Sequence, residues 1–337
     1  MSIAATLQLL AAAPIEFSPE ERCFVLPGVG RKRGLTKILS ALMPVPHGEP
    51  EPGEPEPKRC RRSKTDPVPA PVIWTHAAHP ESRRWISRAA PSCRAATTAC
   101  SLEGLDDEAG RAGIGRAYNT RHGSLVDEQL KLRVAGGRLA LRDKAHGPMR
   151  GGLDPCTATL LDYLEWRKQR IVAAQVPLYS AEMDVATAID FLADDGTLYE
   201  LKSSTVTERE ALRRSDRSYE LPRARLTRTA LRGTPCSMYA LHQLQLYTMC
   251  SMMREMIGVE PPAAAVLRVS PGVVREYALN PWFKERSVRF RRAIAQQTGQ
   301  HKRNLRAKRH VRQLDTPAAA KRQARPLDAA PSKRRKR

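Results

Sequence analysis

The chain has 337 residues and a formal net charge of +22, and 41% of its residues are hydrophobic while 27% are charged. It is long enough to bury one or two cores, and the absence of any run of 18 apolar residues argues against a membrane-spanning helix and a membrane partner. Its seven cysteines are scattered and odd in number, which favours a reducing compartment over a disulfide framework.

The first 72 residues predict little buried structure. Residues 1–43 begin with an apolar stretch that has no basic region, which indicates a short amphipathic helix rather than a secretory signal. We expect a small N-terminal appendage there. Residues 44–72 are rich in Pro, Glu, Lys and Arg, a composition that cannot bury a core and predicts a disordered linker. This linker contains a first basic cluster, KRCRRSK, at 58–64.

Residues 73–283 are expected to form the main domain, with a core from about 115 to 270. The segment 73–112 gives no clear secondary-structure signal. Two histidines and two cysteines in it suggest a zinc set, but their spacing matches no common zinc pattern, so we predict none. These four residues are His76, His79, Cys93 and Cys100.

The apolar periodicity becomes clear after residue 113. Helices are predicted over 125–134, 157–174 and 237–258, and strands over 176–183, 185–193, 197–204 and 263–270. This order predicts an α/β domain with a mixed central β-sheet flanked by helices.

Most of the positive charge lies in the last segment. Residues 284–337 contain 19 basic and 3 acidic residues and end in SKRRKR. We expect a basic disordered tail that binds nucleic acid by counterion release and resembles a nuclear localisation signal at its end. Import receptors and a nuclear location follow from this prediction. The alternative is a solvated tail that mainly aids solubility.

The stretch IDFLADDGTLYELK gathers acidic residues around a predicted hairpin. If the tripeptide DDG at 194–196 forms a three-residue loop with its glycine in the left-handed conformation, the numbers of facing residues sum to 390. Asp190 then lies opposite Glu200, and Lys202, two residues further along, lies on the same face. A two-residue turn would shift the register by one and break this convergence.

Two carboxylates this close repel each other unless a cation offsets their charge. Mg²⁺ takes oxygen ligands, often one or two carboxylates with substrate phosphate and water, and Mn²⁺ can substitute for it. A lysine beside such a metal can orient or deprotonate a water aimed at phosphorus, so the pattern indicates metal-assisted phosphodiester hydrolysis. The alternative is a solvated acidic hairpin in which Lys202 forms a surface ion pair.

Three short patterns resemble the PD-(D/E)XK nuclease superfamily. Asp190 followed by ELK at 200–202 resembles its signature. The Gln-x3-Tyr pattern at 243–247 resembles a motif of RecB-like and lambda-exonuclease-like members, a group that takes in the viral alkaline-exonuclease type. RHGSLVDEQL at 121–130 resembles the helix that opens this fold. The resemblance covers roughly residues 115–270 and implies a restriction-endonuclease-like core.

The resemblance implies a role for each residue of the signature. Asp190 and Glu200 would hold the metal together with the backbone carbonyl of Leu201, and Lys202 would act on the attacking water. The chain departs from the family pattern at Ile189, which stands where a proline usually precedes the first aspartate.

Residues on the two helices would complete the site. By resemblance, Asp127 or Glu128 would complete the metal shell, although the segment between this helix and the hairpin is long. Gln243 and Tyr247 would shape the site and contact the DNA strand, since their i, i+4 spacing places them on one helix face. The alternative for these two residues is a place in the core, where a tyrosine on an apolar helix is usual.

Further charged residues have two interpretations. Glu165 is a competing acid, and its simpler interpretation is a solvent-facing partner of Lys168. A group of arginines between the hairpin and the 237–258 helix can clamp phosphates beside the site, or can belong to a solvated loop. They are Arg213, Arg214, Arg217, Arg223 and Arg225.

The sequence therefore predicts a Mg²⁺-dependent deoxyribonuclease. The resemblance favours exonucleolytic digestion of duplex ends in recombination, repair or viral genome processing. The basic ends suit a viral protein acting in a host nucleus. Relatives can form rings around DNA, but nothing in the residues fixes an oligomeric state. The rivals are a structure-specific endonuclease or RNA-degrading nuclease of the same fold, and a non-enzymatic DNA-binding or packaging protein.

Overall fold

The computed structural model describes residues 3–12, 15–18, 23–26, 30–35, 38, 42, 70–85, 123, 125–134, 153–204, 219 and 231–314. The helices and strands follow in the order α1 (Ile3–Ala11), β1 (Glu16–Ser18), β2 (Cys23–Leu26), β3 (Gly30–Gly34), β4 (Val72–Thr75), α5 (Pro155–Trp166), β5 (Ile171–Ser180), β6 (Val185–Ala193), β7 (Leu198–Ser203), α8 (Met238–Ile257), β8 (Ala264–Ser270), β9 (Val273–Ala278), η2 (Pro281–Phe283) and α9 (Lys284–Leu314). Residues 125–134 are also helical. In these ranges, no helix combines the length and the apolar character needed to cross a membrane.

The strands form one mixed sheet. Its order is β1-β2-β3-β6-β7-β8-β9-β4, and β5 pairs with β6 outside this path. β7 and β8 run parallel, whereas β5–β6, β6–β7, β8–β9 and β4–β9 are antiparallel pairs. The chain passes from β7 to β8 through α8, because parallel neighbours need a crossover connection. The predicted class, α/β with a mixed central sheet flanked by helices, is confirmed.

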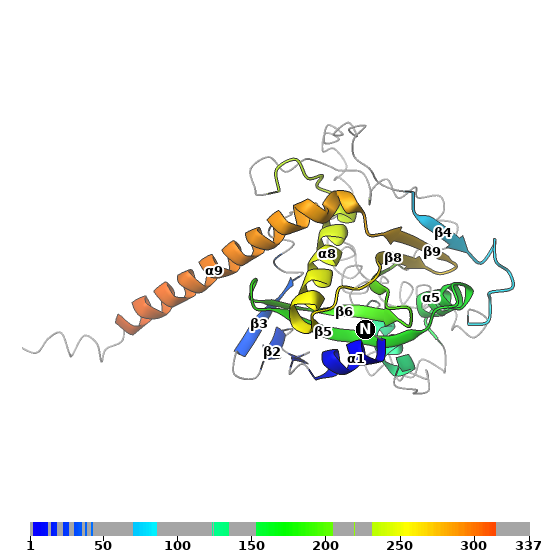
Figure 1. Ribbon diagram of the computed structural model, residues 1–337, viewed down its shortest axis with the longest axis horizontal. Coiled ribbons are helices and arrows are strands. Elements are labelled where there is room, and N and C mark those ends of the chain that lie inside the picture. The colour runs from blue at the N-terminus through cyan, green and yellow to red at the C-terminus, as the bar shows by residue number, and fades with distance from the viewer. Residues whose placement is uncertain are drawn as a thin grey trace, which may run out of the picture.

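Each face of the sheet packs against its own helices. α8 lies across one face, where Leu198 of β7 joins its apolar cluster (Figure 1). On the other face, α5 and the helix 125–134 pack against Tyr199. Successive side chains of a strand point to opposite faces. Glu200 and Lys202 therefore point toward α8, on the same face as Leu198.

The two ends of α5 explain why one predicted helix was too long. The side chain of Asp154 accepts hydrogen bonds from two backbone N–H groups of the first turn. At the other end, Lys168 has a left-handed backbone with a φ of 57°, which ends the helix. The prediction of one helix over 157–174 is wrong, since the residues after Arg170 form β5 and pair with β6.

The strands β1, β2 and β3, from the described part of residues 1–43, belong to the main sheet. β3 pairs with β6 in parallel, with Arg33 opposite Val185 and Gly34 opposite Ala186. The short, polar sequence of β3, GRKRG, carries no alternating apolar pattern, so its place in the sheet comes from tertiary pairing. The predicted linker lies almost wholly outside the described residues.

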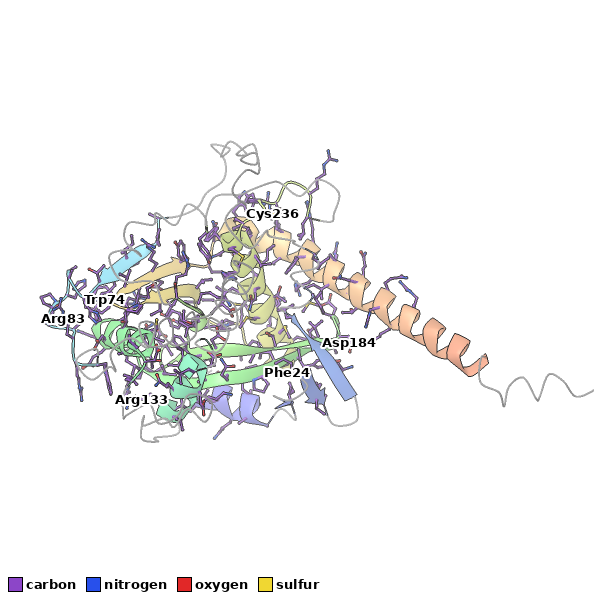
Figure 2. All side chains as sticks on the ribbon, turned by 180° about the vertical axis from the view of Figure 1, so that it is seen from behind. Phe24, Trp74, Arg83, Arg133, Asp184 and Cys236 are labelled. Atoms are coloured by element: carbon purple, nitrogen blue, oxygen red, sulfur yellow. The ribbon has the colours of Figure 1, made fainter. Side chains whose placement is uncertain are left out.

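Asp184 ties three distant parts of the chain together. It occupies the turn between β5 and β6, with a φ of 54°. Its carboxylate accepts a hydrogen bond from Lys32 of β3 at 2.6 Å and one from Lys302 of α9 at 2.6 Å. Figure 2 labels Asp184 at the place where these elements meet. Burial tends to raise the pKa of Asp184, but the two lysines lower it below its ordinary value.

α9 corrects the prediction of a disordered tail that begins at residue 284. The chain is helical to Leu314, and α9 extends well beyond the sheet (Figure 1). Its first half is anchored, because Phe290 and Ile294 are fully buried and the Thr298 hydroxyl donates to the Met183 carbonyl. The many basic residues of this segment obscured the apolar residues that recur at helical spacing, and the helix was therefore not predicted. The remaining tail, with its nuclear-localisation-like end, lies outside the described residues.

Candidate active site

The hairpin between β6 and β7 has the predicted register. Phe191 pairs with Tyr199 and Leu192 pairs with Leu198, so facing residue numbers sum to 390. Gly196 has a φ of 85°, as the three-residue loop requires. The two aspartates of the loop face away from the predicted site: they accept hydrogen bonds from Gln169, Arg170 and Thr197 and hold the turn itself.

The strands of the hairpin part at Asp190. In place of a backbone pair with Glu200, the Asp190 carboxylate accepts a hydrogen bond from the Leu201 N–H at 2.6 Å. Its other oxygen accepts one from the Gln175 amide at 3.2 Å. Gln175 has a left-handed backbone, φ 52°, a strained conformation for a non-glycine residue and typical of functional sites. The carboxylate is thus held by two partners, from both neighbouring strands.

Glu200 is the most buried acid of the site. Its side chain is 2% exposed, and one oxygen, Oε1, accepts hydrogen bonds from the Lys202 ammonium at 2.5 Å and from the Gln245 amide at 2.7 Å. The second oxygen, Oε2, is buried and has no hydrogen-bond partner among the described residues. A buried carboxylate oxygen without a partner is costly, and in a native structure it points to a missing ion or water.

Electrostatics links these residues with Asp127, on the helix 125–134. Burial raises the pKa of Asp127; Lys202 lowers it and Glu200 raises it, to a value of about 6. Burial, followed by Glu200 and Asp127, raises the pKa of Asp190 well above its ordinary range. Burial lowers the pKa of Lys202, but the charges of Glu200 and the two aspartates have the larger effect. The pKa of Lys202 is therefore above its ordinary value. The predicted convergence of Asp127, Asp190, Glu200 and Lys202 is therefore present, while Glu128 is exposed.

Gln243 and Tyr247 do not reach this cluster, and their predicted place at the site is corrected. The Gln243 amide donates to the Ala278 carbonyl at 3.1 Å and accepts from the Asn280 N–H at 2.8 Å. The Tyr247 hydroxyl donates to the Asn280 carbonyl at 3.1 Å. Both side chains thus fix the chain after β9. Their i, i+4 spacing does put them on one face of α8, but that face meets β9 and η2.

Two other residues of α8, Gln245 and His242, face the acids and were not predicted from the sequence. Gln245 bonds Glu200, as above, and His242 lies close enough to Lys202 to sense its charge. Burial, then Lys202 and Arg268, lowers the pKa of His242 well below its ordinary value, so the ring is neutral. It is hydrogen-bonded to the Tyr219 hydroxyl at 3.0 Å. The way α8 packs against β7 determines that Gln245, and not Gln243, faces the site. This packing cannot be predicted from the helical pattern of the sequence.

The remaining predicted residues lie elsewhere. Glu165 does not pair with Lys168; it accepts hydrogen bonds from the Trp85 indole at 3.1 Å and from Arg84 at 3.4 Å. Leu201 lies in β7 between the two charged residues, as its predicted role needs. The five arginines predicted to clamp phosphates, residues 213 to 225, lie outside the described part of the chain.

The fit to a metal depends on how many carboxylates the metal needs. Among the described residues, no group of three or more His, Cys, Asp or Glu side chains is arranged so that it can hold a metal ion by itself. Mg²⁺ commonly uses only one or two protein carboxylates and keeps water and phosphate for its other positions. The unpartnered oxygen of Glu200 beside Asp190 meets that smaller requirement.

Comparison with known proteins gives no further guide to this site. No protein-family model matches the chain, and no curated protein is significantly similar to it.

Proposed function

We propose that the protein is a metal-dependent nuclease that hydrolyses phosphodiester bonds of DNA. The observation that carries this proposal is the buried, unpartnered oxygen of Glu200 within a cluster of three carboxylates and one lysine. A structural ion pair between Glu200 and Lys202 explains why one carboxylate oxygen, Oε1, is buried. It does not explain the second oxygen. Nor does it explain why Asp190 lies near Asp127, where burial, Glu200 and Asp127 raise the pKa of Asp190.

Asp190, Glu200 and the backbone carbonyl of Leu201 are the groups that would hold Mg²⁺, or Mn²⁺ in its place, with Asp127 as the outer acid. A bound divalent ion would supply a positive charge for the phosphate oxygens and make an attacking water more acidic. The raised pKa values of Asp127 and Asp190 support this assignment, since burial, together with the charge of Glu200, makes both ionised carboxylates unfavourable without a cation.

The chain's own residues would position the reactants. Burial lowers the pKa of Lys202, but the charges of Glu200, Asp190 and Asp127 raise it, and its ammonium would orient water and phosphate. Its side chain is 35% exposed, so it can reach a substrate that the buried Glu200 cannot. Gln245 holds Oε1 of Glu200 and thereby fixes the direction of Oε2. Hydrolysis joins the water oxygen to phosphorus and releases one strand end as a hydroxyl.

DNA is the proposed substrate because a net charge of +22 favours a long polyanion. Digestion from duplex ends is the proposed mode, as in the lambda-exonuclease-like enzymes that the motifs resemble, with a role in recombination, repair or viral genome processing. The basic clusters support import into a nucleus. An endonuclease of the same fold would use the same residues, so only the products separate the two activities.

The test is cleavage of end-labelled linear duplex and of closed circular DNA, with Mg²⁺ and with EDTA. Asp190→Asn, Glu200→Gln and Lys202→Ala are expected to abolish cleavage and leave DNA binding intact. Asp194→Asn is the matched control, since this acid lies in the same hairpin and bonds only the loop and Arg170. Loss of the linear DNA alone indicates an exonuclease, and nicking of the circle indicates an endonuclease.

A second pair of variants tests the site geometry. Gln245→Ala is expected to lower kcat at least tenfold, because Glu200 loses the partner that orients it. Gln243→Ala is expected to lower the stability by about 1–3 kcal/mol, because two backbone groups lose their partner, with little change in kcat of the folded fraction. Tight DNA binding with no cleavage in Mg²⁺ or Mn²⁺ would refute the nuclease proposal and leave a DNA-binding or packaging protein.

A further inference from the structure

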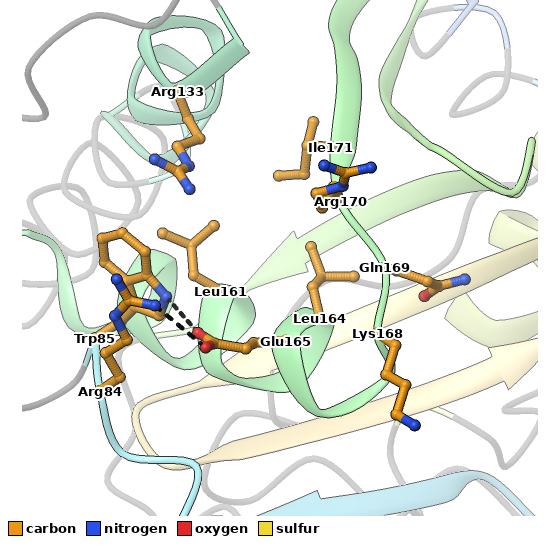
Figure 3. Close-up of a pocket in the computed structure, with 10 residues that line it drawn as sticks. All are labelled: Arg84, Trp85, Arg133, Leu161, Leu164, Glu165, Lys168, Gln169, Arg170 and Ile171. Atoms are coloured by element: carbon orange, nitrogen blue, oxygen red, sulfur yellow. Dashed lines mark hydrogen bonds and ion pairs between the residues drawn. The ribbon is translucent and has the colours of Figure 1, made fainter.

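A cavity of about 550 Å³ lies apart from the acidic cluster (Figure 3). It is lined by Arg84 and Trp85, the C-terminal half of α5, residues 168–171 and Arg133 of the helix 125–134. None of Asp127, Asp190, Glu200 and Lys202 lines it. Its volume falls within the range of about 300–1,000 Å³ that is typical of small-molecule sites.

One side of the cavity is apolar and flat. Leu161 and Leu164 of α5 and Ile171 of β5 point into it, and the Trp85 ring forms a wall. Trp85 is held in place by two acids of α5: its indole N–H donates to Glu165 at 3.1 Å and its backbone N–H donates to Asp162 at 2.8 Å. A fixed indole above an aliphatic floor is a surface on which a planar aromatic group can stack.

The rim of the cavity is cationic. Arg84, Arg133, Lys168 and Arg170 line it, against the single acid Glu165. Arg84 pairs with Glu165 at 3.4 Å, and Arg170 pairs with Asp194 at 3.2 Å.

For the other two cations, Arg133 and Lys168, no acidic partner exists among the described residues. The guanidinium groups of Arg133 and Arg84 lie over the Trp85 ring, 5.0 Å and 5.4 Å from its centre, so a base stacked on the indole would lie next to positive charge. An anion entering the cavity would meet the Arg133 guanidinium, which no acid of the described residues neutralises.

We propose that this cavity binds a nucleotide, with its base stacked on Trp85 and against the aliphatic side chains and its phosphate beside Arg133. The combination of side chains argues against simpler ligands. An inorganic anion would make no favourable contact with an indole and three aliphatic side chains, and an apolar ligand would make none with four cations. Base–aromatic stacking with a neighbouring arginine is how many proteins hold unpaired nucleotides.

The proposal does not rest on the nuclease activity, because binding here needs no metal and no cleavage. The ligand has two sources, a free mononucleotide or an unpaired nucleotide of a DNA strand. The helix 125–134 carries both Asp127 and Arg133, about 9 Å apart along its axis. This places the cavity within reach of a strand that also passes the acidic cluster.

The test measures binding to the full chain carrying Lys202→Ala, which separates the result from cleavage. The probes are dAMP, deoxyadenosine, inorganic phosphate, a 12-nucleotide single strand and a blunt duplex, in about 0.2 M salt to weaken contacts with the basic tail. Trp85→Leu and Arg133→Ala are each expected to weaken dAMP binding about tenfold or more. Arg254→Ala is the matched control, an exposed arginine of α8 outside the cavity.

Each outcome decides the proposal. It is supported if dAMP binds more tightly than deoxyadenosine and phosphate and both cavity variants weaken it. A single strand that binds more tightly than dAMP, with the same sensitivity to Arg133→Ala, identifies the strand as the source. Phosphate that binds as tightly as dAMP, or dAMP binding unchanged in Arg133→Ala, overturns it. Because Arg133 is exposed, that variant decides the matter even if Trp85→Leu fails to fold.

Discussion

Replacing Asp127 by asparagine should make the protein more stable at neutral pH. Burial and the charge of Glu200 outweigh the attraction of Lys202 and raise the pKa of Asp127 to about 6, against 3.8 for a free aspartate. The folded protein therefore binds this proton more tightly than the unfolded chain does. The stability that this proton provides is complete below about pH 4 and is lost as the pH rises through about 6.

The size of the effect follows from that pKa. One pKa unit corresponds to about 1.4 kcal/mol, so ionising Asp127 in the folded state costs at most about 3 kcal/mol. Because the side chain is partly exposed, solvent and salt reduce the cost to about 1–2 kcal/mol. Asparagine resembles the protonated acid and avoids the cost. Asp127→Asn should therefore exceed the wild type by about 1–2 kcal/mol at pH 7 and match it at pH 4.

Urea denaturation at pH 4, 5, 6 and 7 in EDTA measures this difference. Glu128→Gln is the matched control, because it removes a charge from the next, exposed position and should change the free energy of unfolding by less than about 0.5 kcal/mol. The reasoning is refuted if Asp127→Asn is less stable than the wild type at pH 7, or if its gain is the same at pH 4. In either case Asp127 does not belong to a crowded acidic cluster.

Two further predictions concern backbone conformation and use the same denaturation assay. Lys168→Gly should raise the free energy of unfolding by about 0.5–1 kcal/mol, because Lys168 has the left-handed conformation that glycine adopts without strain; a loss would contradict that conformation. Gly258→Ala should lower it by about 1 kcal/mol, since Gly258 ends α8 with a φ of 71°. Gly299→Ala should raise it by about 0.5–1 kcal/mol, because Gly299 is helical and an added Cβ meets no atom within 4 Å. Shifts of the two glycine variants in the same direction would contradict this account.

The sequence predicted best what depends on local pattern. Strand alternation and the DDG loop predicted β6, β7 and the 390 register of residues 191–199 and 192–198, with Glu200 and Lys202 on one face. The predicted pair of Asp190 with Glu200 does not form, because the strands part at Asp190. The long apolar helix α8 was also predicted with nearly its observed ends. In each case the signal lies within about 20 consecutive residues, and no knowledge of distant packing is required.

Features that depend on long-range packing were predicted poorly. Gln243 and Gln245 are two residues apart on α8, and only the packing of α8 against β7 decides that Gln245 meets Glu200. β3 and β4 are short strands whose pairing depends on partners far along the chain. Trp85 and Arg133 are far apart in the sequence and become neighbours only in the folded chain. None of these arrangements produces a periodic pattern of apolar residues in the sequence.

The contacts of Asp184 have a consequence for the order in which the chain folds. Its bond to Lys32 joins residues 152 positions apart, and its bond to Lys302 joins the body to the last helix. Closing such long loops costs chain entropy, whereas the β5–β6–β7 meander closes only short turns. The meander, with the acids of the candidate site at its centre, is therefore the segment best suited to form early. β3 and α9 would then attach to it late in folding, with Asp184 as the contact that they share.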